Sequence, residues 1–469
     1  MAQLHDLSAL DLRDELRSGA VGPVEVSQHF LARIAEHDDG LGAFTTVTPE
    51  RASERAQHLE SHRPADDEYP LLWGMPLADK DLNDRAGVPT GHGSRLGGGI
   101  PAQSEQLVHD LDAAGVVSLG KTASPEFGLY GYTESAVAPP TRHPEASHLG
   151  VGGSSGGAAA AVAARLLPFA PGSDGGGSVR IPAAATGLVG IKPTRILIPA
   201  DAAAGPSFTG VVSGPIAHSV ADAALLFDGM MAAAGPDRER FGRAAASVQG
   251  PLRIAVVTAS PWDDSHGVAI DPAGLEALAD ATKALQQAGH VVLNAGESKM
   301  IRYPRLDYPG IFTMAWQRSA AAIPAHTEHE LNLLMPVTRE LVLRGRAITP
   351  EQAAQNDTDL ATYGAALREA FSEVDIVLTP ALAQSPRPIG AYSDDADVNF
   401  AQQVAYSPFT SAINVAGLPA ISLPAGRYEV DFSEVPLPMG VQLVGRFGDD
   451  ATLVSVAAQL ERVLALPLG

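Results

Sequence analysis

The sequence predicts an α/β fold, in which a β-sheet is covered by helices on both sides. From about residue 72 onward, short apolar runs bounded by Gly and Pro alternate with helical stretches, an order typical of such a sheet. Before that point, helical periodicity predicts two amphipathic helices within residues 8–36. Ser8 is the expected N-cap of the first helix, and the segment "SGAVGP" separates the two. We expect these helices to form an outer layer.

The later elements follow the same alternation. Strands are predicted at 115–122, 166–174, 252–257, 290–296, 374–381 and 439–446, and helices at 154–167, 272–288, 350–372 and 450–464. Neither an internal repeat nor a low-complexity linker divides the 469 residues, so a single domain over 1–469 is expected. It comprises a helical N-terminal layer at 1–62, a core at about 72–230 and an insertion or lid at about 296–350.

Charge and composition argue against several classes of function. The net charge of −22 opposes binding to nucleic acid or to an anionic membrane surface. The absence of cysteine excludes disulfides, thiolate metal sites and a cysteine nucleophile. The first residues show no secretion signal, and no uninterrupted apolar run reaches about 18 residues. We therefore expect a cytoplasmic protein without a nucleic-acid or membrane partner.

The histidines do not indicate a metal site. The 14 histidines are scattered, and the closest group, "HTEHE" at 326–330, lacks the spacing of a zinc-binding motif. His326 and His329 fit an exposed helical turn better. We expect no metal and no cofactor.

The segment "GVVSLGKT", Gly115 to Thr122, matches the phosphate-binding loop pattern of a nucleotide hydrolase. That loop should follow a strand and open a helix. Here the apolar β-branched run lies inside the supposed loop, and Pro125 follows where the helix should grow. The segment is therefore better interpreted as a strand that ends near Lys121.

A second glycine-rich segment, "GGSSGG" at 152–157, fits the Gly-x-Ser-x-Gly elbow of an esterase, with Ser154 as the nucleophile. The alanine-rich stretch that follows is a credible helix. However, the elbow requires a strand before the serine, and "TRHPEASHLGV" is polar and interrupted by proline. We therefore expect a turn rather than a strand there.

A third segment places Gly175, Gly176 and Gly177 directly before Ser178. Consecutive glycines can expose several backbone N–H groups toward one point, as an oxyanion requires during acyl transfer. The alternative is a tight turn with a helix-capping serine. Lys80, in "GMPLADKD", has a similar ambiguity, because it could be a solvated strand end or a buried neutral base.

Residues 152–194, "GGSSGGAAAAVAARLLPFAPGSDGGGSVRIPAAATGLVGIKPT", closely resemble the signature block of the amidase signature family. "GMPLADKD" around Lys80, "GKTASPEFG" and "SPFTSAINVAGLPAISLP" also resemble family landmarks, and the similarity runs through nearly the whole chain. The resemblance implies one large domain with a mixed sheet, and a cofactor-free hydrolase that cleaves the C–N bond of a carboxylic amide. The expected partner is a small-molecule amide, with a homodimer left open.

The resemblance also implies a Ser–Ser–Lys triad. Ser178 would attack the carbonyl and form an acyl-enzyme, while Ser154 would relay the proton to neutral Lys80. In the family, the relay serine follows a cis peptide bond, which corresponds here to Gly153–Ser154.

Further roles carry over to the residues around the triad. The N–H groups of Gly175, Gly176, Gly177 and Ser178 would form the oxyanion hole. Asp174 and Arg180 would support the loop, and Ser155 would support the relay. Gly175 stands where threonine is common in the family, which would loosen the loop or widen the acyl pocket.

The substrate is predicted less directly. A small or aryl amide, anilide or hydrazide is favoured, and the candidate pocket residues are Phe127, Tyr130, Tyr132, Met314 and Trp316. An amidotransferase subunit that delivers ammonia to a partner is a competing hypothesis, but the chain lacks the family's Ser-Arg-Asp-Gly run after "KPTR". A Gly-x-Ser-x-Gly esterase and an inactive binding protein also stay open.

Overall fold

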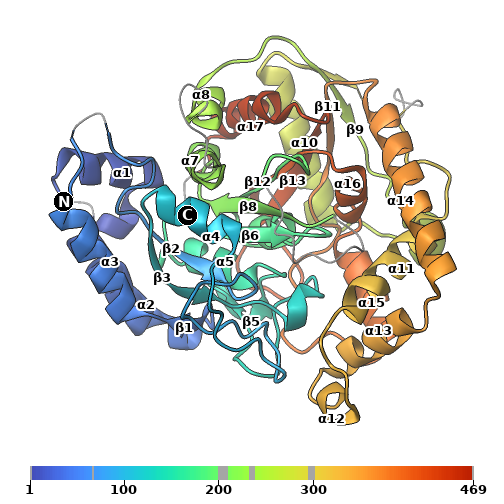
Figure 1. Cartoon of the computed structure of the whole chain (residues 1–469). Helices are drawn as coiled ribbons and strands as arrows, with labels where there is room; N and C mark the ends of the chain where they lie inside the picture. The colour runs from blue at the N-terminus through green and yellow to red at the C-terminus, as the bar shows by residue number, and fades with distance from the viewer. Residues whose placement is uncertain (1–2, 66–67, 199–209, 232–237, 294–300, 467–469) are drawn as a thin grey trace.

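The central feature of the fold is an eight-stranded mixed β-sheet (Figure 1). The computed structural model describes residues 3–65, 68–198, 210–231, 238–293 and 301–466. In order across the sheet, its strands are β10 (Val291–Leu293), β9 (Arg253–Val256), β11 (Ile376–Pro380), β13 (Leu437–Gly445), β12 (Ala420–Tyr428), β7 (Val189–Lys192), β8 (Val212–Ala217) and β6 (Phe169–Asp174). β9 pairs in parallel with β10 and β11, and the other neighbours are antiparallel. The predicted mixed α/β fold is confirmed.

Helices cover both faces of this sheet. On one side lie α7 (Val220–Met230), α10 (Pro272–Gln287) and α17 (Asp450–Leu464), and on the other lie α14 (Pro350–Phe371) and α16 (Ser411–Ala416). The residues of β11 alternate between the two cores. Ile376 and Leu378 pack with α10 and α17, whereas Val377 packs with α14 and α16. This period of two is what a strand buried on both faces requires.

The N-terminal part is helical and lies beside a second, smaller sheet (Figure 1). Its helices are α1 (Ala9–Ser18), α2 (Pro23–His37) and α3 (Pro49–Ser61), beside a sheet of β1 (Phe44–Val47), β3 (Val117–Thr122) and β2 (Pro76–Lys80). The Ser8 hydroxyl accepts the Asp11 N–H at 3.0 Å, which confirms the expected N-cap. β2 pairs in parallel with β3 and packs against β6. Lys80, the last residue of β2, is therefore brought to the large sheet.

The segments that link the strands of the two sheets contain the glycine-rich motifs, and their structure can be compared with what each motif predicts. They contain α4 (Gln106–Ala113), the hairpin of β4 (Arg142–His143) and β5 (Ala146–Gly150), α5 (Gly156–Ala163) and α6 (Arg180–Ala185). The predicted strand that ends near Lys121 is confirmed as β3, and no helix follows it before Pro125 within this described segment. The expectation of a turn before Ser154 was wrong, because β5 ends four residues earlier. However, β5 pairs only with β4 and lies outside the central sheet.

The described part of the predicted insertion, residues 301–350, is helical. It contains α11 (Tyr308–Ala321), α12 (Glu328–Leu331) and α13 (Pro336–Arg346), which lie near α15 (Ala396–Tyr406) in Figure 1. His326 and His329 lie exposed at the short α12, as predicted. Residues 296–300 of this segment lie outside the described residues. The remaining helices are α8 (Arg240–Ala246), α9 (Asp263–His266) and 3-10 turns at Leu4–Asp6, Asp38–Gly40 and Glu126–Gly128.

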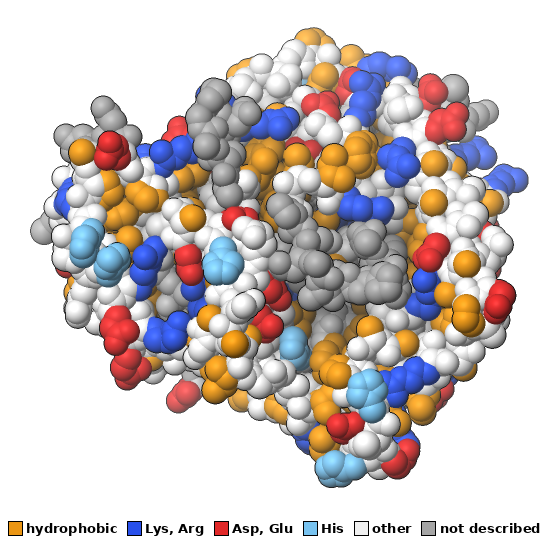
Figure 2. All heavy atoms as spheres, in the orientation of Figure 1, with side chains coloured by type: hydrophobic (Ala, Val, Ile, Leu, Met, Phe, Trp, Pro, Cys, Tyr) orange, Lys and Arg blue, Asp and Glu red, His pale blue; other side chains and the backbone are white. Residues whose placement is uncertain are grey.

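The surface carries its charge in a dispersed way. Among the described residues on the face in Figure 2, acidic and basic side chains are interspersed rather than gathered by sign. Across the part of the chain that the structure describes, no helix combines the length and apolar character needed to cross a membrane.

Candidate active site

Lys80 is fully buried at the end of β2, so the interpretation as a solvated strand end is wrong. Its Nζ lies 2.7 Å from Ser154 Oγ and 3.0 Å from Ser173 Oγ. Burial lowers the pKa of Lys80 to about 7, although the nearby Asp174 carboxylate opposes this shift. A substantial fraction of the amine is therefore neutral near pH 7, and its lone pair can accept the Ser154 hydroxyl proton across the 2.7 Å contact.

Ser154 and Ser155 connect this lysine to the segment that carries Ser178. The Gly153–Ser154 peptide bond is cis, as the family resemblance implied. Ser155 donates its backbone N–H to the Ser178 carbonyl at 3.0 Å, and its hydroxyl lies 3.3 Å from both the N and the O of Ser173. Since Ser154 has a lysine partner rather than a histidine, its surroundings differ from those of a Gly-x-Ser-x-Gly esterase.

The glycine loop leaves β6 and turns tightly before Ser178. Gly177 has φ +128°, and a Cβ at this position would lie 2.4 Å from Thr410 Oγ1, so a side chain would not fit without a rearrangement. Its N–H donates to Asp174 Oδ1 at 2.8 Å. Gly177 was expected to contribute an oxyanion-hole donor, but in this structure its N–H holds the loop to Asp174. Within the described chain, the N–H groups of Gly175, Gly176 and Ser178 donate no hydrogen bond.

A buried ion pair supports this loop. Asp174 and Arg180 are both fully buried, with Arg180 Nη2 2.8 Å from Asp174 Oδ1 and Nε 3.0 Å from Oδ2. Asn414 donates to the same carboxylate at 2.9 Å. Burial raises the pKa of Asp174, but the Arg180 guanidinium outweighs burial and holds the pKa well below its usual range. The charged carboxylate is thus available as an acceptor for the Gly177 and Val179 N–H groups.

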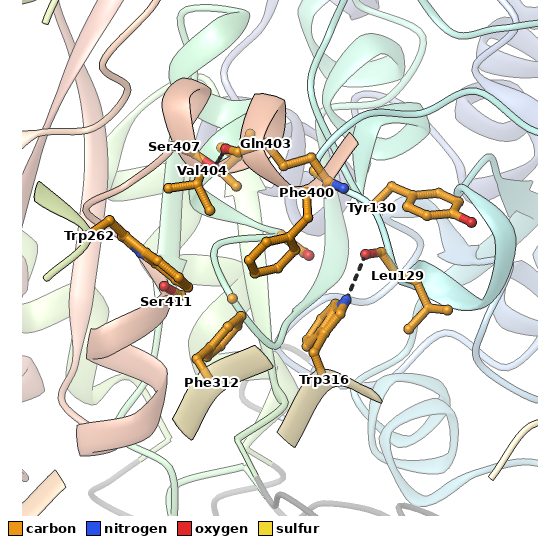
Figure 3. Close-up of a pocket in the computed structure, with 14 residues that line it drawn as sticks. Leu129, Tyr130, Trp262, Phe312, Trp316, Phe400, Gln403, Val404, Ser407 and Ser411 are labelled. Atoms are coloured by element: carbon orange, nitrogen blue, oxygen red, sulfur yellow. Dashed lines mark hydrogen bonds between the residues drawn. The ribbon is translucent and has the colours of Figure 1, made fainter. Parts of the chain in front are cut away.

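Ser178 lies at the wall of an aromatic cavity of about 60 Å³ and is 7% exposed. The cavity is lined by residues from widely separated parts of the chain (Figure 3). These are Leu129, Tyr130, Gly131, Gly176, Ser178, Ile181, Trp262, Phe312, Trp316, Phe400, Gln403, Val404, Ser407 and Ser411. The lining includes Tyr130 and Trp316, which were predicted as pocket residues from the sequence.

The other three predicted pocket residues do not line this cavity. Phe127 stacks on His92, with ring centroids 5.5 Å apart. Tyr132 is buried between other rings, and its hydroxyl accepts a hydrogen bond from Asn399 at 2.9 Å. Met314 lines a separate groove between α11 and α14. Each was selected as an aromatic or a large apolar side chain near a motif, and this criterion does not separate core residues from cavity residues.

Sequence reasoning missed most of the cavity wall. Trp262 precedes α9, Phe312 lies in α11, and Phe400 and Gln403 lie in α15. The only local signal was an aromatic residue at helical spacing, which core residues also give. The Gly131 N–H donates to Gln403 Oε1 at 2.7 Å, although the two residues are 272 positions apart. Neither segment carries a sequence pattern that predicts this contact.

Metal ligation finds no support in the described ranges, which contain no group of three or more His, Asp or Glu side chains placed to hold an ion. The site has instead a short chain of polar groups, in which a buried amine contacts one serine hydroxyl and a second serine stands at an apolar cavity. These groups can perform nucleophilic and acid–base chemistry.

Comparisons with known proteins identify the family. The amidase family model matches residues 25–454. "Putative amidase AmiB2" of Mycobacterium tuberculosis is 36% identical over 450 residues, which cover 95% of this chain and 94% of the relative. An acylamidase of Rhodococcus erythropolis is 29% identical over 483 residues and covers 98% of this chain and 96% of its own.

A solved structure agrees with these matches. The 6-aminohexanoate cyclic dimer hydrolase, complexed with its substrate, superposes with a TM-score of 0.84 at 27% identity, over 99% of this chain and 98% of that one. The sequence matches and the shared fold indicate the same family. The chain belongs to the amidase signature family and is a hydrolase that acts on carbon–nitrogen bonds.

Proposed function

We propose that the chain hydrolyses a small or aryl carboxylic amide through an acyl-enzyme on Ser178. The observation that carries this proposal is the 2.7 Å contact between Ser154 Oγ and Lys80 Nζ. This contact can carry a proton because burial lowers the pKa of the Lys80 amine to about 7. A base must be neutral at the working pH to accept a proton, and burial gives Lys80 this property.

The chemical steps follow from the order of the polar groups. Ser178 Oγ attacks the carbonyl carbon, and its proton passes to Ser154 Oγ as the Ser154 proton passes to Lys80 Nζ. When the C–N bond breaks, Ser154 returns a proton to the leaving nitrogen and recovers one from Lys80. Water then attacks the ester carbonyl and passes a proton through Ser154 to Lys80. When the bond to Ser178 Oγ breaks, Lys80 returns the proton through Ser154, which releases the acid and restores the Ser178 hydroxyl.

The negative charge that develops on the carbonyl oxygen requires donors. We assign this role to the backbone N–H groups of Gly175, Gly176 and Ser178, which the described residues leave free. Each such donor contributes about 3–4 kcal/mol to the transition state. The Gly177 N–H serves a different purpose, since it fixes the loop to Asp174.

Three residues act as positioning residues in this proposal. The Asp174 carboxylate holds the glycine loop from within, Arg180 neutralises that buried carboxylate, and the Ser155 backbone N–H holds the Ser178 segment beside the relay. The similarity to an acylamidase supports an acylated amine, that is, an amide, as the substrate.

An acyl-enzyme makes a prediction that a direct attack of water does not make. Amides and anilides that share one acyl group should give the same ratio of hydroxamate to acid when hydroxylamine competes with water, because all pass through one intermediate. Ser178→Ala should lower kcat by about 1,000-fold or more while Tm changes by only a few degrees. A ratio that varies with the leaving group, or substantial turnover by Ser178→Ala, would contradict the proposal.

A further inference from the structure

We propose that the aromatic cavity beside Ser178 is the acyl-group pocket, that it admits only compact uncharged acyl groups, and that Trp316 sets its length. This inference rests on the proposed function of Ser178 as the nucleophile. It adds which side of the scissile bond the cavity binds, which class of acyl group fits there, and which residue limits the length of that group.

The side of the bond follows from the path of the proton. The leaving nitrogen must face Ser154, because Ser154 returns the proton to it. The cavity is lined by Ser178 and by Gly176 of the glycine loop, but neither Ser154 nor Lys80 is among its described lining residues. The cavity therefore lies on the other side of the carbonyl, where the acyl group remains attached after the amine has left.

The lining selects against charge. None of its described residues is Asp, Glu, Lys, Arg or His. The polar groups of Gln403 are already used, since Oε1 accepts from the Gly131 N–H at 2.7 Å and Nε2 donates to Asn399 at 2.6 Å. The Ser411 hydroxyl accepts from buried Tyr308 at 2.7 Å. An ionised acyl group would lose its hydration here without gaining a counter-charge.

The size of the cavity limits the length of the acyl group. A volume of about 60 Å³ holds roughly four to six non-hydrogen atoms, because one water-sized group needs about 10–15 Å³ on the same measure. A single ring or a short chain meets this limit. Longer chains exceed this volume.

The α11 wall is held firmly in place (Figure 3). The Trp316 indole donates to the Leu129 carbonyl at 3.1 Å and stacks on Phe312 with centroids 5.6 Å apart. Phe312 in turn meets Trp262 edge to face at 5.8 Å. A Cβ added at Gly175 would lie 3.8 Å from Trp316, so the indole also borders the glycine loop. Trp316 is therefore the residue whose truncation should lengthen the pocket.

The test uses a series of linear acyl anilides with one constant leaving group. In the wild type, kcat/KM should rise to a chain of about five carbons and then fall at least about 10-fold by about ten carbons. A terminal carboxylate on the acyl chain should lower kcat/KM by about 100-fold or more relative to the isosteric carboxamide. A flat dependence on length, or equal rates for the charged and neutral pair, would overturn the inference.

Two variants assign the limit to one side chain. Trp316→Ala should shift the optimum to longer chains, whereas Met314→Ala, on the same helix but lining the other groove, should leave it unchanged. Trp316→Leu provides a second truncation if the alanine variant does not fold. A shifted optimum in Met314→Ala, or an unchanged one in folded Trp316 variants, would overturn the inference.

Hydroxamate formation separates the two proposals. If hydroxylamine traps no acyl intermediate from any member of the series, the proposed function fails. If the intermediate forms but its rate of formation is independent of chain length and charge, only the assignment of the pocket fails.

Discussion

The acidic limb of the pH profile should report the titration of Lys80. The proposed relay needs the neutral amine, and burial lowers the pKa of Lys80 to about 7. Lowering the pH protonates the amine and removes the base, so activity is present above the pKa and is lost as the pH falls through it.

The expected magnitude follows from this pKa. Two pH units below a pKa of about 7, about 1% of the amine is neutral, so kcat/KM at pH 5 should be about 100-fold below its plateau. Below about pH 6, log kcat/KM should fall with a slope of about one. An unperturbed lysine would place this limb near pH 10 instead.

The assay is the hydrolysis of a neutral anilide between pH 5 and pH 9, with circular dichroism at each pH to verify the fold. Glu461 provides a matched control, because burial raises its pKa to about 7 while it accepts the Val220 N–H at 2.9 Å, remote from the site. Glu461→Gln keeps an acceptor and should leave the profile unchanged. Buried Lys192 also has a pKa lowered to about 7, but its Nζ contacts the Pro193 carbonyl rather than Ser154.

Two outcomes would refute the role of Lys80. A kcat/KM that stays constant from pH 8 to pH 5 in folded protein would mean that the base is not an amine with this pKa. An acidic limb that disappears in Glu461→Gln would assign the titration elsewhere. Lys80→Met should be inactive at every pH, and activity in this variant would also contradict the account.

The remaining predictions concern the support of the glycine loop. Arg180→Met should destabilise the fold by about 3–5 kcal/mol, because it leaves the Asp174 carboxylate buried and unpaired; urea unfolding at constant m-value measures this, and a loss below about 1 kcal/mol would contradict it. Gly177→Ala should lower both Tm and kcat/KM, because φ is +128° and the added Cβ would approach Thr410 Oγ1 to 2.4 Å. Gly176→Ala should fold normally, since the nearest atom would be Phe312 Cζ at 3.4 Å, and equal losses of Tm in the two glycine variants would refute this reasoning.

The strands and helices that the sequence placed by residue range all overlap observed elements, but other elements were missed. The helix expected at 350–372 is observed at Pro350–Phe371, because Thr349 caps its start and the periodicity spans six turns. β12, at Ala420–Tyr428, was not predicted. Pro424 and Gly426 interrupt its pattern, and the register shift between them accommodates both residues inside a sheet. Only the pairing with β7 and β13 makes this segment a strand.

The site could be predicted in part. The segments with Ser154 and Ser178 carry local glycine patterns, so their chemistry is visible in the sequence. The burial of Lys80 is not, because it arises when β2 packs between β3 and β6. The cavity wall is also a tertiary property. Met314 and Trp316 are two positions apart on α11, and residues at this spacing point to different sides of a helix.

The most direct test of the account is intact-protein mass spectrometry after treatment with a small fluorophosphonate, followed by peptide mapping. A single adduct on Ser178, absent from Ser178→Ala and suppressed at low pH as Lys80 is protonated, is the predicted result. An adduct on Ser154 or Ser155 would contradict the assignment of the nucleophile and favour the elbow serine. No adduct in folded protein at pH 8 would contradict the proposal that Ser178 is activated at all.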